Sequence, residues 1–173
     1  MSTAVHVNTT TYATTHVATN MLGSIRSIIK GSGLNPDLLR DQWAVLEHGI
    51  ATWLSSRHLK TVTLEVYDPG KRPDDLTGRF DFTIDYGYYP GGDGDLWLDP
   101  DTVAYAIRKN GSYPGRCAYR IVIDLAFGHP EIPGWTATTY RSTTEFTRHV
   151  VGTALGGGSL GAGLSYYARG SSR

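Results

Sequence analysis

Apolar residues recur with helical spacing through the first part of the chain. Over residues 12–29 they fall at i, i+3, i+4 and i+7, which places them on one side of a helix. The glycines of "KGSG" end this helix, and a second apolar stripe continues over residues 36–57 after a capping Asn35. The pattern predicts two amphipathic helices that pack as a hairpin.

The period then changes from helical to alternating. Residues 61–67 and 79–88 alternate between apolar and polar positions on either side of a proline- and glycine-rich turn, which predicts an antiparallel hairpin. Its polar face, with Glu65 and Asp81 among its members, is expected to contact water. A short helix follows, capped by Asp99, and residues 117–125 form a third apolar strand.

The C-terminal quarter has β character but no strong apolar stripe. It reads "WTATTYRSTTEFTRHVV" and then "GTALGGGSLGAGL", with "LSYYAR" as a candidate last strand. The order of helix, helix, strand, strand, helix, strand and β-prone tail predicts an α+β fold. At 173 residues the chain is expected to form one domain.

Composition narrows the classes of function. Lysine plus arginine equals aspartate plus glutamate at 16 each, so no overall charge favours nucleic acid or a membrane surface. Cys117 is the only cysteine, and no signal peptide or membrane-spanning run is evident. We therefore expect a soluble, cytoplasmic protein without direct nucleic-acid or membrane contacts.

Two stretches invite a nucleotide- or metal-binding hypothesis. The range Gly156–Gly161 spells G-x-G-x-x-G, but a dinucleotide fingerprint needs a following helix and a later acidic residue, and neither is present. The aspartates of "GGDGDLWLDPD" lack the register of a calcium loop, and the histidines lack metal-ligand spacing. We expect no catalytic residues, no metal and no cofactor, with a small nucleotide-binding enzyme that uses both stretches kept as an alternative.

The whole pattern resembles a bacterial HORMA-domain protein of the second bacterial HORMA family, which occurs in CBASS anti-phage operons. The segments that carry the resemblance are "YATTHVATNMLGSIRSIIKGSG", "DQWAVLEHGIATWLSSRHLKTVTLEVYDP", "RFDFTIDYGY", "LWLDPDTVAYAIRKNG", "CAYRIVID" and "GWTATTYRSTTEFTRHVVGTALGGGSLGAGLSYYAR". The resemblance implies a three-stranded antiparallel sheet backed by three helices, with a mobile C-terminal safety belt. It divides residues 1–173 into a flexible N-terminus (1–10), a core (11–133) and a belt with tail (134–173).

The resemblance also implies particular sites. Some apolar residues of a belt that closes around a closure-motif peptide would line the peptide-binding channel, and the glycines of the belt would act as a hinge. The N-terminal segment would be the contact for an AAA+ ATPase that opens the belt. The expected peptide-binding residues are Trp135, Tyr140, Phe146 and Val150, although these side chains could equally pack the belt on the core. The expected hinge is Gly156, Gly157 and Gly158, and the expected contacts for the ATPase are Thr3, Val5 and Val7.

The function implied is that of a non-enzymatic adaptor. It would close on a peptide, and would then bind and activate a CD-NTase, a cyclic-oligonucleotide synthase. A second HORMA protein or a second copy of this chain is a further expected partner. An alternative role is that of a paralogue whose own terminus is the peptide for a sister HORMA protein.

Overall fold

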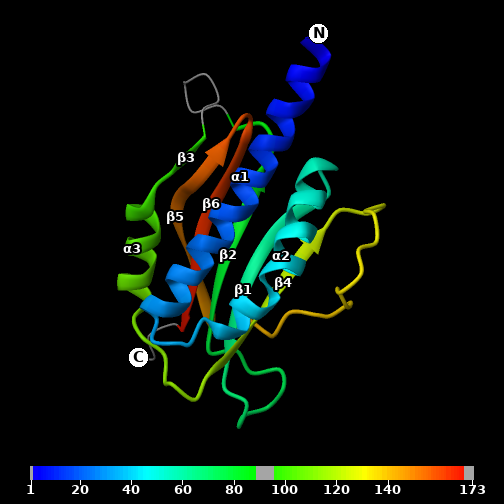
Figure 1. Cartoon of the computed structure of the whole chain (residues 1–173). Helices are drawn as coiled ribbons and strands as arrows, with labels where there is room; N and C mark the ends of the chain where they lie inside the picture. Colours follow the sequence, from blue (N-terminus) through cyan, green and yellow to red (C-terminus); the bar gives the residue numbers. More distant parts are fainter. Residues whose placement is uncertain (1, 89–95, 170–173) are drawn as a thin grey trace.

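Three helices cover one face of an antiparallel sheet in the computed structural model, which describes residues 2–88 and 96–169, with side chains from residue 13 onward (Figure 1). The elements in chain order are α1 (Ser2–Gly31), α2 (Asp37–Ser55), β1 (Leu59–Tyr67), β2 (Gly78–Asp85), β3 (Trp97–Leu98), α3 (Pro100–Asn110), β4 (Ala118–Leu125), β5 (Phe146–Gly157) and β6 (Leu160–Arg169). The strands lie in the order β3-β5-β6-β2-β1-β4. The α+β class expected from the sequence is confirmed.

The helix ends follow the capping signals with one large difference. Asp99 caps α3 as predicted, since its Oδ1 accepts a hydrogen bond from the Asp101 N–H at 3.0 Å. Asn35 Oδ1 accepts from the Asp37 N–H at 2.9 Å, and α2 begins at Asp37, one residue after the expected start. The backbone of α1 is already helical from Ser2, whereas the sequence predicted a helix from residue 12. The backbone is therefore helical over most of residues 1–10, and the flexibility expected for this N-terminal segment stays a prediction.

The sheet contains the three expected strands and continues beyond them. Strands β2, β1 and β4 are neighbours and antiparallel. The hairpin of β5 and β6 adds to the free side of β2, through the pairing of β6 with β2. The short β3, which the sequence analysis missed, pairs with the end of β5 through Trp97 and Leu98.

The core lies between the helices and one face of the sheet. The buried residues of α1 have the predicted spacing, and they meet the apolar positions of β1, β2 and β6. Large side chains with almost no exposure include Trp53, Phe80, Phe82, Met21 and Ile25. Each such side chain stabilises the fold by roughly 1.5–3 kcal/mol through its removal from water.

The middle of the polar face of β1 and β2 is buried, which corrects the sequence-based expectation there, whereas Thr83 and Asp85 farther along β2 are exposed as expected. Thr63 and Glu65 have 0% exposure and Asp81 has 5%. Charged side chains are rarely buried to this degree unless they are paired. A distant part of the chain must therefore cover and partner this face.

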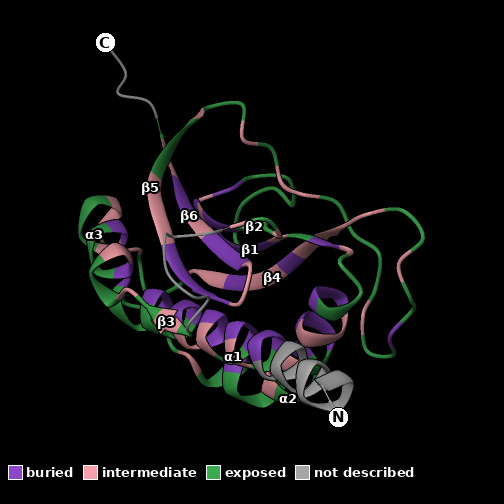
Figure 2. Ribbon diagram, turned by 90° about the horizontal axis from the view of Figure 1, so that it is seen from above, coloured by how far each residue is buried: buried purple, intermediate pink, exposed green. Residues whose placement is uncertain are grey.

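The covering part is the connection between β4 and β5, residues 126–145, which we call the crossing segment. Strand β4 forms one edge of the sheet, whereas β5 lies beyond β2 and β6 on the other side. Figure 2 shows the helices on one face, with the crossing segment passing around the β4 edge and over the opposite face. No helix in the described part of the chain is long and apolar enough to span a membrane.

Candidate functional site: a strand edge enclosed by the crossing segment

The outer edge of β4 is the first component of the site. Among the strands of the described residues, β4 is the last of the sheet and pairs only with β1. In an antiparallel strand, alternate residues direct their N–H and C=O groups to opposite sides. Half of the backbone groups of β4 therefore point away from β1, where they can pair with an added strand.

On the helix side of this edge, the crossing segment is anchored to α2. The Trp135 ring packs edge-to-face on Trp53, with ring centroids 5.2 Å apart. The Nε1 of Trp53 donates to the Pro130 carbonyl at 2.8 Å, and Ile132 is only 8% exposed. Trp135 also lies against Gly49, because a Cβ on this glycine would be 2.6 Å from Trp135 Nε1.

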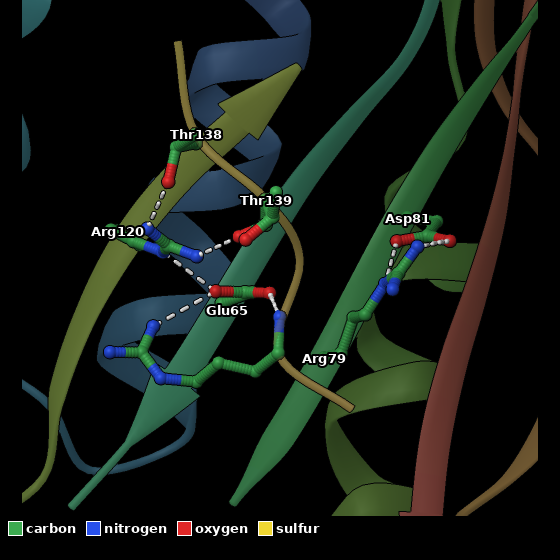
Figure 3. A network of polar contacts seen from close by, with 7 residues as sticks. Glu65, Arg79, Asp81, Arg120, Thr138 and Thr139 are labelled. Atoms are coloured by element: carbon green, nitrogen blue, oxygen red, sulfur yellow. Dashed lines mark hydrogen bonds and ion pairs between the residues drawn. The ribbon is translucent and has the colours of Figure 1, made fainter. Parts of the chain in front are cut away.

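On the opposite face, buried charges hold the crossing segment (Figure 3). Glu65 Oε1 accepts from Arg120 Nε at 2.7 Å and from Arg141 Nη1 at 3.0 Å, while Glu65 Oε2 accepts from the Arg141 backbone N–H at 2.8 Å. Arg120 also donates to Thr138 Oγ1 at 2.9 Å and to the Thr139 carbonyl at 2.6 Å. We call Glu65, Arg120 and Arg141 the clasp. It joins β1, β4 and the crossing segment in one charged network.

A second polar group lies beside the clasp. The Arg79 guanidinium packs on the Tyr140 ring at 4.2 Å and on the Tyr167 ring at 4.8 Å, and it forms two hydrogen bonds with Asp81. Thr63 Oγ1 also donates to Asp81 Oδ1 at 2.8 Å. Burial raises the pKa of Tyr140, partly offset by Thr63 and Arg79, so the phenol stays neutral over the physiological range.

These two anchors define a closed path around the β4 edge. Trp135 lies on the helix side and Arg141 on the opposite face, so residues 136–140 must pass over the edge between them. A cavity of about 330 Å³ lies between the edge and this part of the chain. Its walls come from β4, α2 and the crossing segment: Trp53, Ile121, Val122, Ile123, Leu125, His129, Glu131, Ile132, Trp135, Thr136, Ala137 and Thr138. We call this space the channel.

The four residues expected to bind a peptide lie in three different places. Trp135 lines the channel, and Tyr140 lies outside it, on Arg79. Phe146 and Val150 are on β5, across the sheet from the β4 edge, with Val150 69% exposed. The structure thus brings only Trp135 to the channel, and a peptide-binding role for these residues stays a prediction.

Other residues of the channel could not be identified from the sequence. Ile121 and Ile123 appeared there only as core positions of a strand, and Glu65 only as part of a wet face. The sequence does contain one signal for the clasp, because Glu65 lies in a predicted strand and Arg120 and Arg141 lie in two later β-prone segments. Without the strand order, this signal does not identify which charged side chains meet.

The glycine stretch forms a tight hairpin. Gly158, with φ +62°, and Ser159 connect β5 to β6, and Gly156 pairs with Gly161. A glycine at the first position of a two-residue turn is typical of a type II′ hairpin. The G-x-G-x-x-G spacing is therefore part of two strands, with no helix after it in the described residues, and it does not form the strand-loop-helix of a dinucleotide site.

The remaining predicted sites fall partly outside the described residues. Thr3, Val5 and Val7 lie in the first turns of α1, and their side chains are not among those described. Asp93 and Asp95 of the aspartate-rich stretch are outside the described residues as well. Within the described part of the chain, no three histidine, cysteine or acidic residues gather as a metal site.

Replacing Gly49 with alanine should loosen the anchor at Trp135. Helix propensity alone favours alanine in the middle of α2 by about 0.5–1 kcal/mol. The new Cβ would, however, lie 2.6–2.8 Å from three atoms of the Trp135 ring, so the ring must move. We expect faster amide hydrogen exchange over residues 134–138.

Gly23→Ala is the matched control for this experiment, because Gly23 is also within a helix and nothing lies within 4 Å of its added Cβ. It should stabilise the fold without any change at Trp135. If Gly49→Ala behaves in the same way as Gly23→Ala, Trp135 does not depend on its contact with α2.

Comparison with known protein families identifies the family of this chain. The family model described as bacterial HORMA domain 2 matches residues 2–170. The chain belongs to the bacterial HORMA domain 2 family. A search of curated proteins finds no match.

Several solved structures share the fold. A chain of the E. coli MS115-1 CdnC:HORMA-deltaN complex has a TM-score of 0.61 at 9% identity, over 93% of this chain and 90% of that one. A chain of the mitotic checkpoint complex has a TM-score of 0.58 at 7% identity, over 79% and 75%. C. elegans HTP-2 bound to the HIM-3 closure motif has a TM-score of 0.53 at 16% identity, over 78% and 71%. At these identities the likeness establishes the fold of this HORMA domain.

Proposed function

We propose that this HORMA domain is a non-enzymatic adaptor that encloses an extended peptide in the channel. The observation that carries the proposal is the position of the crossing segment, which is anchored on both faces of the sheet around the unpaired β4 edge. A peptide there would pair with β4 as an added strand. It could not leave sideways until one anchor detaches.

The family and its solved relatives support the proposed partners. HTP-2 is bound to a closure motif in its structure, and a HORMA protein is in complex with CdnC in another. We infer that the peptide-bound form of this chain binds and activates a CD-NTase in CBASS anti-phage defence. The adaptor role assigns no catalytic residue to the chain, and the hairpin at Gly156–Gly161 removes the main support for a nucleotide-binding enzyme.

An AAA+ ATPase that pulls on α1 is the proposed means of opening. The hairpin tip lies against α1, because a Cβ on Gly158 would be 3.5 Å from Ala13 and one on Gly157 would be 3.6 Å from His16. His16 Nε2 also lies 3.5 Å from the Trp97 carbonyl of β3. Unwinding of α1 from its N-terminus would remove these contacts and free the hairpin from one side.

Cutting the crossing segment should release an enclosed peptide. We suggest a protease recognition site inserted after Ser142, which is exposed, in a chain refolded with a fluorescent peptide selected for binding. Before cleavage, dissociation should be slow, because the peptide must wait for an anchor to open. After cleavage, dissociation should be at least tenfold faster, as measured by fluorescence anisotropy with excess unlabelled peptide.

The control is the same recognition site after Gly70, in the exposed turn between β1 and β2. Cleavage there leaves the path around the β4 edge intact and should not change the dissociation rate. Equal release after either cut would disprove enclosure by the crossing segment. Synthase activity, measured in the same samples, should require the enclosed peptide.

A further inference from the structure

The walls of the channel differ in chemistry from one side to the other. On the helix side, Ile121 and Ile123 pair in register with Leu64 and Val62, two fully buried core positions. Their side chains therefore lie on the apolar face of the sheet. Trp53, Ile132 and Trp135 complete this apolar wall.

The wall formed by the crossing segment is lined by short side chains. Thr136, Ala137 and Thr138 pass over the edge, and all three are exposed. Small residues let a second backbone approach the β4 edge closely. The channel thus has room for a strand on the edge, and the space for large side chains is on the helix side only.

One acidic side chain in the wall of the channel has no partner in the described part of the chain. The charged side chains of β4 outside the channel lining are already paired: Arg120 is engaged by Glu65, Thr138 and Thr139, and a carboxylate oxygen of Asp124 lies 3.8 Å from Lys60 Nζ. Glu131 lines the channel and has no ion pair or hydrogen bond among the described residues. An added cation would complement this carboxylate, whereas an added acid would be repelled.

We infer that the channel selects an extended peptide with large apolar side chains at alternate positions and a lysine or arginine beside Glu131. The inference rests on the proposed peptide-binding function and adds the chemistry of the ligand. The alternation follows because successive side chains of an added strand point to opposite faces. Every second side chain of the peptide then contacts the apolar wall of isoleucine and tryptophan on the helix side. The side chains between them lie on the opposite side, towards the covered polar face of the sheet.

The test is a selection from short random peptides displayed on phage, with the full chain refolded in their presence. The expected result is enrichment of sequences with apolar residues at every second position and a basic residue near one end. In the synthetic versions of the enriched peptides, aspartate at one alternate apolar position should weaken binding about tenfold to hundredfold. The same residues in scrambled order should bind with a similar loss.

Glu131 is tested by charge reversal. Glu131→Lys should weaken binding of the basic peptide by up to about fivefold, as expected for an exposed pair. A peptide with glutamate in place of the basic residue should recover binding to this variant only. Unchanged affinities in both combinations would overturn the assignment of Glu131.

Two further variants separate this inference from the proposed function. Ala137→Trp should fill the channel and abolish enrichment, whereas Thr147→Trp adds the same side chain to an exposed position on β5 and should not. Enrichment of peptides without alternation, still blocked by Ala137→Trp, would overturn the inference and leave the proposed function standing. No enrichment above the Ala137→Trp background would contradict the proposed function itself.

Discussion

Replacing Glu65 with alanine should detach the crossing segment from the sheet. The carboxylate has 0% exposure and accepts three hydrogen bonds from two arginines. Removal of one partner from a buried ion pair typically costs about 3–5 kcal/mol, because the other charge is left without compensation. Here two guanidiniums would face each other, so the cost is expected at the upper end of this range.

The structure also indicates that Glu65→Ala leads to local opening of the crossing segment before global unfolding. Arg141 lies on a segment with many exposed residues and Arg120 on an edge strand, so both can reach water if residues 138–141 lift away. Local opening is cheaper than global unfolding, because the strand pairing of the sheet and the packing of the helices stay intact when these residues lift away. The Arg141 amide, which donates to Glu65 Oε2, should lose its protection from hydrogen exchange. A channel-bound peptide should dissociate at least a hundredfold faster.

Two variants act as controls for Glu65→Ala. Asp124→Ala removes an acid from the neighbouring strand, where its pair with Lys60 is about half exposed, and should change stability by less than about 1 kcal/mol. Glu65→Gln keeps the size and one acceptor oxygen, so it should give an intermediate effect. Full protection of the Arg141 amide in Glu65→Ala would show that the clasp does not hold the crossing segment.

The order and type of the main elements could be predicted from the sequence because their signals are local. The stripe in α1, the cap at Asp99 and the alternation in β1 each lie within one short window. The end of α1 at Gly31 also follows from a local signal. The two-residue β3 carries no periodicity of its own and exists only through its pairing with β5.

The covered polar face could not be predicted in the same way. Glu65 and Arg141 are 76 residues apart in the sequence, and only the path of the chain around the β4 edge brings them together. Alternation correctly indicated which side chains of β1 share a face, but not whether that face contacts water. The same limit applies to the channel, since Ile121 and Ile123 look like ordinary core positions until the edge is known to be unpaired.

The glycine stretch gives the second large effect: Gly156→Ala should destabilise the β5–β6 hairpin. A Cβ on Gly156 would lie 2.6 Å from the Leu160 carbonyl oxygen and 2.8 Å from Trp97 Nε1. The carbonyl belongs to the tight turn, so it cannot move without opening the hairpin. We expect a loss of about 2–4 kcal/mol. The melting temperature should fall by about 4–16 °C, since each kcal/mol shifts it by about 2–4 °C in a chain of this size.

Gly163→Ala is the matched control within the same hairpin. Nothing lies closer than 4.0 Å to its added Cβ, and its φ is not in the left-handed region. Its melting temperature should stay within about 2 °C of the parent chain, because a substitution without a clash changes stability by about 0.5 kcal/mol or less. Gly158→Ala adds only the cost of its positive φ, about 1–3 kcal/mol.

These variants also distinguish two roles for Gly156, Gly157 and Gly158. As a hinge, they would affect the rates of peptide capture and release while the folded state kept its stability. As structural positions, with close neighbours at Gly156 and Gly157 and a positive φ at Gly158, they instead set the stability of the hairpin that joins the C-terminal strands to β2. A stable Gly156→Ala variant with altered exchange rates would support the hinge and contradict the close contact at Leu160. A destabilised one, beside an unaffected Gly163→Ala, would mean that Gly156 is required because no side chain fits between β5, the turn and Trp97.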